Sequence, residues 1–260
     1  MSKPKVVADD LGVATEFTAR PSRVVSLVPS LTESIALTLP GILVGATDYC
    51  THPSTLDSVV RVGGSKYPTL DAVLAARPDL VVANAEENRE EDVLRLRANG
   101  IPVWVTEAAQ TVPIGLASVR RLLIEVLGAP EPRWLLDAER LWAPTGPVRA
   151  TAVIPVWRKP WVVIGRDTFA GDVLRRLGIA NAYADDPDRY PRPSLDDLRA
   201  RFATSAAGLL VLPDEPYLFT EEDGPEAFPG VRHALVSGRH LTWCGPSLVE
   251  AKNLLSEVLA

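Results

Sequence analysis

Short apolar runs rich in β-branched residues alternate with amphipathic segments along the first hundred residues of the chain. The apolar runs predict strands at residues 24–28, 43–46, 79–83 and 102–106. Helices are predicted between them, one beginning near residue 30 and two more at residues 70–76 and 86–98. The run at 79–83 is almost wholly apolar, which is typical of a parallel sheet buried on both faces. Strands and helices in alternation indicate βαβ units and the α/β class.

The first helix carries a predicted start signal. Ser30 follows the first strand, and Glu33 stands three residues later, which is the spacing of a capping box. We interpret these two residues as helix caps. The alternative is that they contact a ligand.

The middle of the chain has a different pattern. From residue 113 to 142 no strand is predicted, and apolar residues recur at helical spacing: Leu116, Val119, Leu122, Leu123 and Val126. Gly128 to Pro130 ends that helix, and residues 133–142 predict another. The alternation then resumes, with strands expected at 151–156, 161–165, 208–212 and 240–244, and helices at 172–177, 195–202 and 249–259.

The second strand-containing region echoes the first. Pro-Thr-Leu-Asp ending at Asp71 precedes a short helix and a buried strand, and Pro-Ser-Leu-Asp ending at Asp196 does the same 125 positions later. We therefore predict an α/β chain of two similar lobes with mainly parallel sheets, joined by a long helical connector. The predicted boundaries are 1–112, 113–145 and 146–260. A ligand cleft is expected between the lobes, because clefts at domain interfaces are preferred binding sites.

Composition narrows the function classes. The chain has 260 residues, a formal net charge of −6 and no block of lysine and arginine, so we expect no nucleic-acid partner. No membrane span is expected either, because Pro29, Glu33 and Pro40 interrupt the longest apolar stretch. We interpret Cys50 and Cys244 as free thiols, with one disulfide as the alternative.

The first ten residues contain no apolar core of the length that a secretory leader needs. As written, the chain is expected in the cytoplasm. If a leader was removed before this numbering begins, the expected place is outside the membrane.

Aromatic and charged residues gather where the predicted strands end. Ligands of open α/β sheets bind beyond the carboxyl ends of the strands, so these residues are candidates for ligand binding: Tyr49, Glu86, Trp157, Trp161, Tyr217 and Trp243. Flat aromatic walls with a few polar groups suit a large, flat, amphipathic ligand. The alternative for Trp157 and Trp161 is that they pack a turn. The alternative for Glu86 is that it lies in a solvated first turn of a helix. His52 is a candidate metal ligand.

Four runs resemble the helical-backbone (class III) substrate-binding proteins of ABC importers, which include cobalamin, iron-siderophore and haem receptors. They are Arg23 to Glu33, Gly45 to Cys50, Arg61 to Gly64 and Arg77 to Val81, and the last three resemble the cobalamin branch. The resemblance implies two α/β lobes joined by one long rigid helix. It also implies that Asp71 and Asp196 dock onto arginines of a permease. In the cobalamin branch Tyr49 matches a ligand-stacking tyrosine, and Tyr190 stands where a tryptophan is frequent.

Three functions therefore compete. The first is a solute-binding protein that captures a metal chelate for an ABC importer, with a corrinoid favoured over an iron-siderophore or haem. The second is a cytoplasmic corrinoid- or chelate-binding scavenger without a permease. The third, an α/β enzyme, is disfavoured because the sequence contains no dinucleotide fingerprint, phosphate loop, nucleophile elbow or metal-ligand spacing. No built-in cofactor and no protein-held metal are expected.

Overall fold

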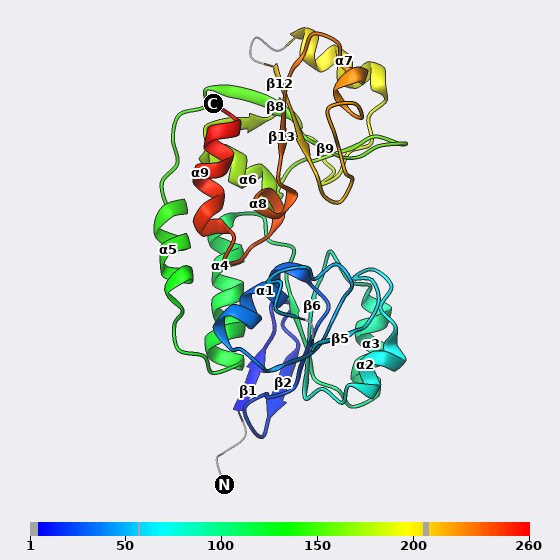
Figure 1. Cartoon of the computed structure of the whole chain (residues 1–260), viewed down its shortest axis with the longest axis vertical. Helices are drawn as coiled ribbons and strands as arrows, with labels where there is room; N and C mark the ends of the chain where they lie inside the picture. The colour runs from blue at the N-terminus through cyan, green and yellow to red at the C-terminus, as the bar shows by residue number, and fades with distance from the viewer. Residues whose placement is uncertain (1–4, 57, 205–207) are drawn as a thin grey trace. The chain divides into compact units, whose positions relative to one another are not determined.

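The computed structural model describes residues 5–56, 58–204 and 208–260 (Figure 1). The chain divides into two compact units. The first holds Met1–Ala108, Gly115–Leu136 and Cys244–Pro246, and the second holds Ala109–Ile114, Asp137–Trp243 and Ser247–Ala260. The residues predicted as a connector are shared between these units. The lobe boundaries at residues 112 and 146 stay a prediction.

The first unit is built on a five-stranded parallel sheet of order β5-β4-β3-β6-β7. Its strands are β3 (Val24–Ser26), β4 (Leu43–Ala46), β5 (Val60–Arg61), β6 (Leu80–Asn84) and β7 (Val103–Thr106). The α/β class and the four strands expected in this region are thereby confirmed.

Both faces of this sheet are buried, and successive residues point to opposite faces. On one side, α1 and η1 pack against Val24, Leu80 and Trp104. On the other side, α2 and α3 pack against Val25, Val81 and Val103. This double burial explains why the strands read as unbroken apolar runs. The helices named here are α1 (Pro29–Thr38), α2 (Leu70–Ala75), α3 (Glu90–Ala98) and the π-helical segment η1 (Arg121–Val126).

The predicted capping box at Ser30 is wrong. The helix α1 begins at Pro29, and its N-cap is Val28, which makes no side-chain cap. Proline suits this position because its missing N–H would have no partner in the first turn. The Thr32 hydroxyl donates to the Val28 carbonyl at 2.9 Å. Ser30 therefore lies inside the helix, and Glu33 is 2% exposed in it.

The predicted helix at 86–98 begins four residues late, at Glu90. The Asn84 side chain explains the delay, since its Oδ1 accepts the backbone N–H groups of Glu86 at 2.9 Å and Glu87 at 3.3 Å. Such an Asx turn offers the backbone an alternative to helix.

The sequence patterns missed an antiparallel hairpin of β1 (Lys5–Ala8) and β2 (Ala14–Phe17). Its turn depends on Asp9, whose Oδ1 accepts the N–H groups of Leu11 at 3.0 Å and Val13 at 2.8 Å. The other oxygen of Asp9 accepts from Arg97 at 2.9 Å.

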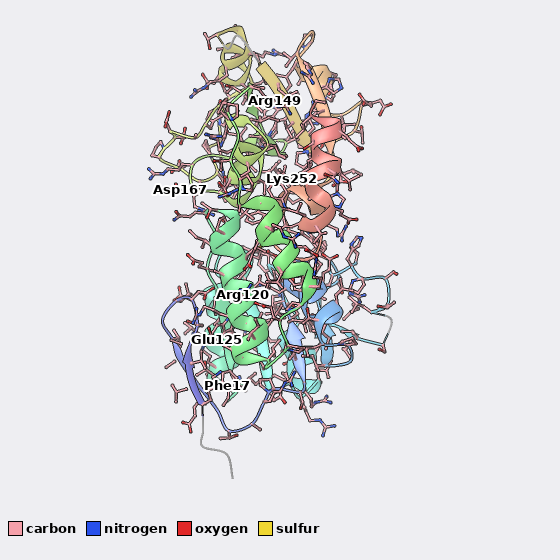
Figure 2. The ribbon with its side chains drawn as sticks, turned by 90° about the vertical axis from the view of Figure 1, so that its left-hand side faces the viewer. Phe17, Arg120, Glu125, Arg149, Asp167 and Lys252 are labelled. Carbon is pink, nitrogen blue, oxygen red and sulfur yellow. The ribbon has the colours of Figure 1, made fainter. Side chains whose placement is uncertain are left out.

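The helical pattern in the middle of the chain is confirmed. α4 (Val112–Arg120) continues into η1, and α5 (Arg133–Trp142) follows. Figure 2 shows Arg120 and Glu125 along the continuous α4–η1 helix, with Phe17 of β2 near its η1 end. The guanidinium of Arg121 bonds the Asp10 carboxylate and lies 5.2 Å from the Trp104 ring.

The second unit contains a four-stranded parallel sheet of order β11-β8-β12-β13. Its strands are β8 (Ala150–Val153), β11 (Ile179–Asn181), β12 (Gly208–Pro213) and β13 (Arg232–Val236), and β9 (Pro155–Trp157) with β10 (Val162–Val163) forms an antiparallel hairpin. Its helices are α6 (Phe169–Arg176), α7 (Leu195–Thr204), α8 (Gly238–Thr242) and α9 (Leu248–Val258), with a 3₁₀ turn η2 (Pro225–Ala227). α7 lies on one side of the sheet, and α6 and α9 lie on the other (Figure 1).

Two expectations for this unit are corrected. The run at 151–156 is two strands, β8 and β9, which belong to different sheets. The strand predicted at 240–244 is wrong, because residues 240–242 belong to α8 and the next two residues are in no strand. The Asp214 carboxylate accepts the Gly238 N–H at 2.6 Å, which turns the chain into α8 after β13. The strands β11 and β13 were not predicted.

Both cysteines are free thiols in the structure. Burial raises the pKa of Cys50 above its ordinary value and the pKa of Cys244 to about 12. Within residues 5–56, 58–204 and 208–260, no helix is long and apolar enough to cross a membrane.

The two thiols, Cys50 buried and Cys244 half-buried, give a first prediction. At pH 8 both groups hold their proton in the folded protein, and the thiolate is the reactive form. We expect a disulfide reagent such as dithionitrobenzoate to label neither cysteine in the native protein and to label both in guanidinium chloride. Rapid labelling of the native protein at pH 8 would contradict the raised pKa values. Raising the pH toward 10 is expected to increase native labelling only slightly.

Candidate functional site

The loops after the strands of the first unit are fixed by two asparagines. Asn84 ends β6 and donates from Nδ2 to the Thr106 hydroxyl at 3.0 Å and the Glu107 carbonyl at 2.9 Å. Asn88 accepts the Asn84 N–H at 2.7 Å and donates to the carbonyls of Leu27 and Ser65. These bonds join the loops after β3, β5, β6 and β7, so the carboxyl edge of the sheet is a fixed rim.

Two tyrosines project from this rim. Tyr49, a predicted site residue, is 66% exposed, and Tyr67 is 70% exposed. Tyr49 lies over Gly64, where an added Cβ would be 3.4 Å from its Cε2 atom. Glu86 is half-buried beside them, and its carbonyl accepts from Lys66 Nζ at 3.3 Å. Sequence reasoning missed Tyr67, although its place just before Pro68 in a rim loop was a usable signal.

In the second unit the structure brings two predicted site residues together. Trp157 ends β9 and is 45% exposed, and its ring meets Tyr217 edge-on, with centroids 5.7 Å apart. The Tyr217 hydroxyl donates to Asp223 at 2.6 Å. The two rings form an aromatic pair beyond the carboxyl ends of β8 and β12.

Arg158 supports Tyr217 of this pair indirectly, through Asp223. Its guanidinium bonds both Asp223 and Glu226, and it lies 5.3 Å from the centre of the Trp161 ring. The hydrogen bond from Arg158 lowers the pKa of Glu226. Arg158, Asp223 and Glu226 were not predicted as site residues, because their contacts join segments that are 65 and 68 positions apart.

The other predicted aromatic residues lie deeper or further along the loops. Trp161 is 9% exposed and stacks on Phe219 at 6.2 Å, within the core cluster under α7. Trp243 is 7% exposed, and its Nε1 donates to Glu215 at 3.2 Å. Tyr190 is 38% exposed in the loop after β11. The ligand-binding role assigned to these residues stays a prediction.

The two echoed aspartates lie at the starts of exposed helices. Asp71 is exposed in the first turn of α2, and the side chain of Asp196 in α7 is 95% exposed. The Ser194 hydroxyl accepts the Asp197 N–H at 3.1 Å and so caps the start of α7. Thr69, the residue before α2, makes no side-chain cap. Neither observation tests a docking role.

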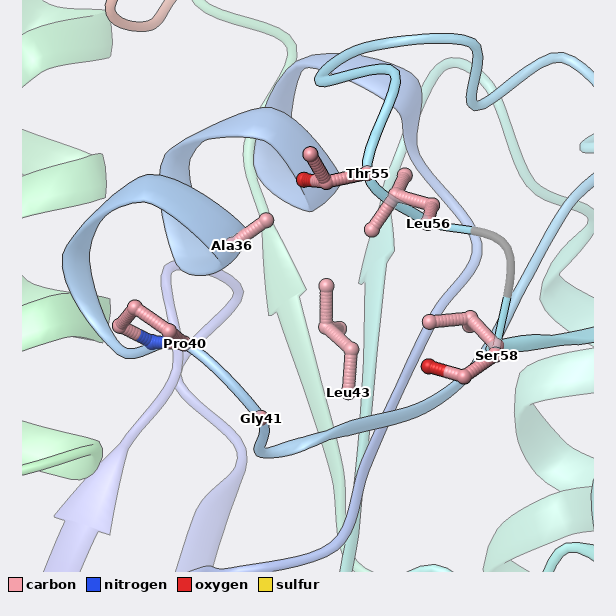
Figure 3. A pocket seen from close by; sticks show the side chains of 8 residues that line it. Ala36, Pro40, Gly41, Leu43, Thr55, Leu56 and Ser58 are labelled. Carbon is pink, nitrogen blue, oxygen red and sulfur yellow. The ribbon is translucent and has the colours of Figure 1, made fainter.

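A small pocket lies at the opposite end of β4 from the tyrosine rim (Figure 3). It has a volume of about 160 Å³ and is lined by residues at the end of α1 and the start of β4, together with Thr55, Leu56, Ser58 and Val59. Its size and place exclude it as the site of a large flat ligand.

In the part of the chain that the structure describes, no group of three or more histidine, cysteine, aspartate or glutamate side chains is arranged to hold a metal ion. His52 bonds the Thr51 hydroxyl at 3.0 Å and is half-buried. Its suggested role as a metal ligand stays a prediction.

Comparisons with known proteins agree with this architecture. The vitamin B12-binding protein of Salmonella choleraesuis (strain SC-B67) is 25% identical over 188 residues, which cover 69% of each chain. The periplasmic heme-binding protein RhuT from Roseiflexus sp. RS-1 superposes with a TM-score of 0.73 at 20% identity, covering 92% of this chain and 99% of that one. The periplasmic vitamin B12-binding protein BtuF of Vibrio cholerae gives 0.69 at 17% identity, covering 92% and 96%. No family model matches the chain.

The structure therefore has the two-unit α/β fold of solute-binding proteins. The resemblance to the helical-backbone (class III) substrate-binding proteins, with their cobalamin, heme and iron-siderophore receptors, is confirmed. The relatives named here are binding proteins rather than enzymes.

The bonds from Arg158 to Asp223 and Glu226 give a second prediction. The folded pKa of Glu226 is depressed, so its contribution to stability is fully present above the ordinary glutamate value of 4.5 and is lost as the pH falls through the lower folded value. We expect Glu226→Gln to lower the free energy of unfolding by under about 1 kcal/mol at pH 7, because the Glu226 side chain is 46% exposed. The cost is expected to shrink as the pH falls below 4.5.

Urea unfolding of wild type and variant between pH 7 and pH 3 checks this. Glu222→Gln is the control, because Glu222 is exposed in the same loop and has no described partner. A cost for Glu226→Gln that stays constant down to pH 3 would contradict the ion pair.

Proposed function

We propose that the protein is a solute-binding protein that captures a large metal chelate and delivers it to an ABC importer. The observation that carries the proposal is the pair of aromatic surfaces at the carboxyl ends of the two parallel sheets. Tyr49 supplies one and Trp157 with Tyr217 supplies the other.

A corrinoid is the favoured ligand, followed by an iron-siderophore or haem. Support for a corrinoid comes from the names of the sequence relatives, which bind vitamin B12. Support for the porphyrin alternative comes from the structural neighbours whose titles name heme. Both are large conjugated rings with polar edges, which aromatic side chains and a few charged groups suit.

The contacts proposed for the ligand come first from the exposed or half-buried residues Tyr49, Glu86, Trp157, Tyr190 and Tyr217. Trp161 and Trp243 are also proposed as ligand-binding residues, although they are only 9% and 7% exposed. The proposed location of the protein is outside the cytoplasmic membrane, by analogy with the structural neighbours that are described as periplasmic.

Ligand capture can be tested by absorption. We expect cyanocobalamin mixed with the protein to shift its visible bands and to quench tryptophan fluorescence, because Trp157 is half exposed at the proposed site. Haemin and ferrichrome, tested in the same way, distinguish the other two ligand classes. A visible spectrum of the protein purified from its host identifies a ligand that is already bound. If none of the three chelates changes either signal at micromolar concentrations, the proposed function is wrong.

Permease docking gives a separate prediction. Asp71 and Asp196 are exposed in the first turns of α2 and α7 and are not among the residues proposed to contact the ligand, so replacing both with asparagine is expected to leave chelate affinity unchanged. The same double variant is expected to lose its complex with an ABC permease, identified by mass spectrometry in solubilised host membranes. Asp185→Asn is the control, because Asp185 is also exposed in the second unit. Loss of the complex in the control, or an intact complex in the double variant, contradicts docking through these aspartates. No permease complex with the wild type supports the scavenger instead.

A further inference from the structure

Tyr67 is the most exposed large hydrophobic or aromatic side chain among the residues that the structure describes. It lies on the loop between β5 and α2, next to the bridge that pairs Gly63 with Pro68. A single exposed ring is common on protein surfaces and by itself needs no explanation. What distinguishes Tyr67 is how its ring is held.

The guanidinium of Arg89 lies over the Tyr67 ring, with its central carbon 4.6 Å from the ring centroid. Arg89 is itself fixed in place by Asp92, which is 1% exposed. Its Nε donates to Asp92 Oδ2 at 2.8 Å, and its Nη2 donates to Oδ1 at 3.1 Å. Glu91 binds the third nitrogen at 2.5 Å. The cation is therefore anchored by a two-pronged bond and cannot follow the ring if the ring turns.

One face of the phenol is covered by a fixed cation, and the side chain as a whole is still 70% exposed. The ring is thus held in one orientation with its remaining surface open. A cation on one face draws electron density from the ring, so the open face favours contact with an electron-rich π-system. The backbone on either side is tied down, since Thr69 N–H donates to the Val62 carbonyl at 2.7 Å.

Tyr49 lies on the same rim. Its ring rests over Gly64, three positions before Tyr67 in the chain. Asn88 joins this loop to the rest of the rim through the Ser65 carbonyl at 2.9 Å. Two open aromatic surfaces, on the loops after β4 and β5, therefore project from the same rim, which suits a ligand broader than a single ring.

We propose that Tyr67 contacts the ligand by stacking on a conjugated macrocycle, a corrin or a porphyrin, and that Arg89, anchored by Asp92, is a positioning residue that acts through Tyr67. The inference rests on the proposed function and deepens it, because it selects macrocycles over chelates that lack a conjugated ring. The phenol hydroxyl is not needed for this role.

The experiment measures the dissociation constants of cyanocobalamin and haemin by quenching of tryptophan fluorescence. For the macrocycle that the wild type binds, Tyr67→Ala is expected to raise the dissociation constant about tenfold. Tyr67→Phe is expected to change the same constant less than about twofold. Leu94→Ala is the control, since Leu94 is 54% exposed on α3. This variant is expected to bind each chelate as tightly as the wild type does. Ferrichrome, whose hydroxamate shell has no conjugated ring, is expected to lose no affinity in any variant if it binds at all.

A double-mutant cycle separates positioning from direct contact. Arg89→Gln alone is expected to weaken binding about threefold, with partial recovery in Arg89→Lys. Added to Tyr67→Ala, it is expected to have no further effect. Thermal melting of each variant checks that the loss is not one of folding, because Asp92 loses its partner in Arg89→Gln.

The outcomes are distinct. If the wild type binds none of the three chelates, the proposed function fails and this inference fails with it. If the wild type binds a macrocycle and folded Tyr67→Ala binds it equally well, only the inference fails. If Tyr67→Phe loses as much affinity as Tyr67→Ala, the hydroxyl is the contact and the stacking role is wrong. If Arg89→Gln weakens binding further in the Tyr67→Ala background, Arg89 touches the ligand and is not a positioning residue.

Discussion

The burial of a parallel sheet on both faces is the constraint from which the rest of the first unit follows. Val24 and Val25, or Leu80 and Val81, are neighbours in the chain and lie in different cores. Helices must therefore cover both faces, and every strand must return by a crossover that leaves the carboxyl edge of the sheet free. That edge is where the loops carrying Tyr49 and Tyr67 lie, so the position of the candidate site is a consequence of the way the core is built.

A free edge still has to be made rigid, and side-chain hydrogen bonds to the backbone do this. Asn84 and Asn88 together satisfy backbone groups in four loops, including the carbonyls of Leu27 and Ser65. Asn84 also delays the start of α3 to Glu90, because its Oδ1 accepts the Glu86 N–H. In the second unit Asp214 has a comparable effect, because its bond to the Gly238 N–H directs the chain from β13 into α8.

The fold class, most strands and the central helices could be predicted because they depend on local apolar patterns such as the run from Leu80 to Ala83. The hairpin β1–β2 could not, since its turn rests on Asp9 bonding two amides and the distant Arg97. The strand expected at 240–244 failed because Leu241 and Trp243 are apolar for packing against neighbouring elements, while Thr242 bonds back to the Gly238 carbonyl in a helical turn. At the candidate site, Tyr49, Trp157 and Tyr217 could be proposed from strand ends. The contacts of Arg158 with Asp223 and of Arg89 with Tyr67 could not, since only the folded chain shows which carboxylates and rings an arginine meets.

Those two arginines show how each unit presents an aromatic surface to solvent without letting it turn freely. A guanidinium can bond carboxylates in its plane while its face packs on a ring, which a lysine ammonium cannot do. Arg89 bonds Asp92 and covers Tyr67, whereas Arg158 bonds Asp223 and Glu226, lies on Trp161 and, through Asp223, fixes the hydroxyl of Tyr217. In both cases the rotational freedom of an exposed ring is removed during folding. A ligand that stacks on such a ring then loses less conformational entropy on binding, so tight capture does not require a large buried pocket within either unit.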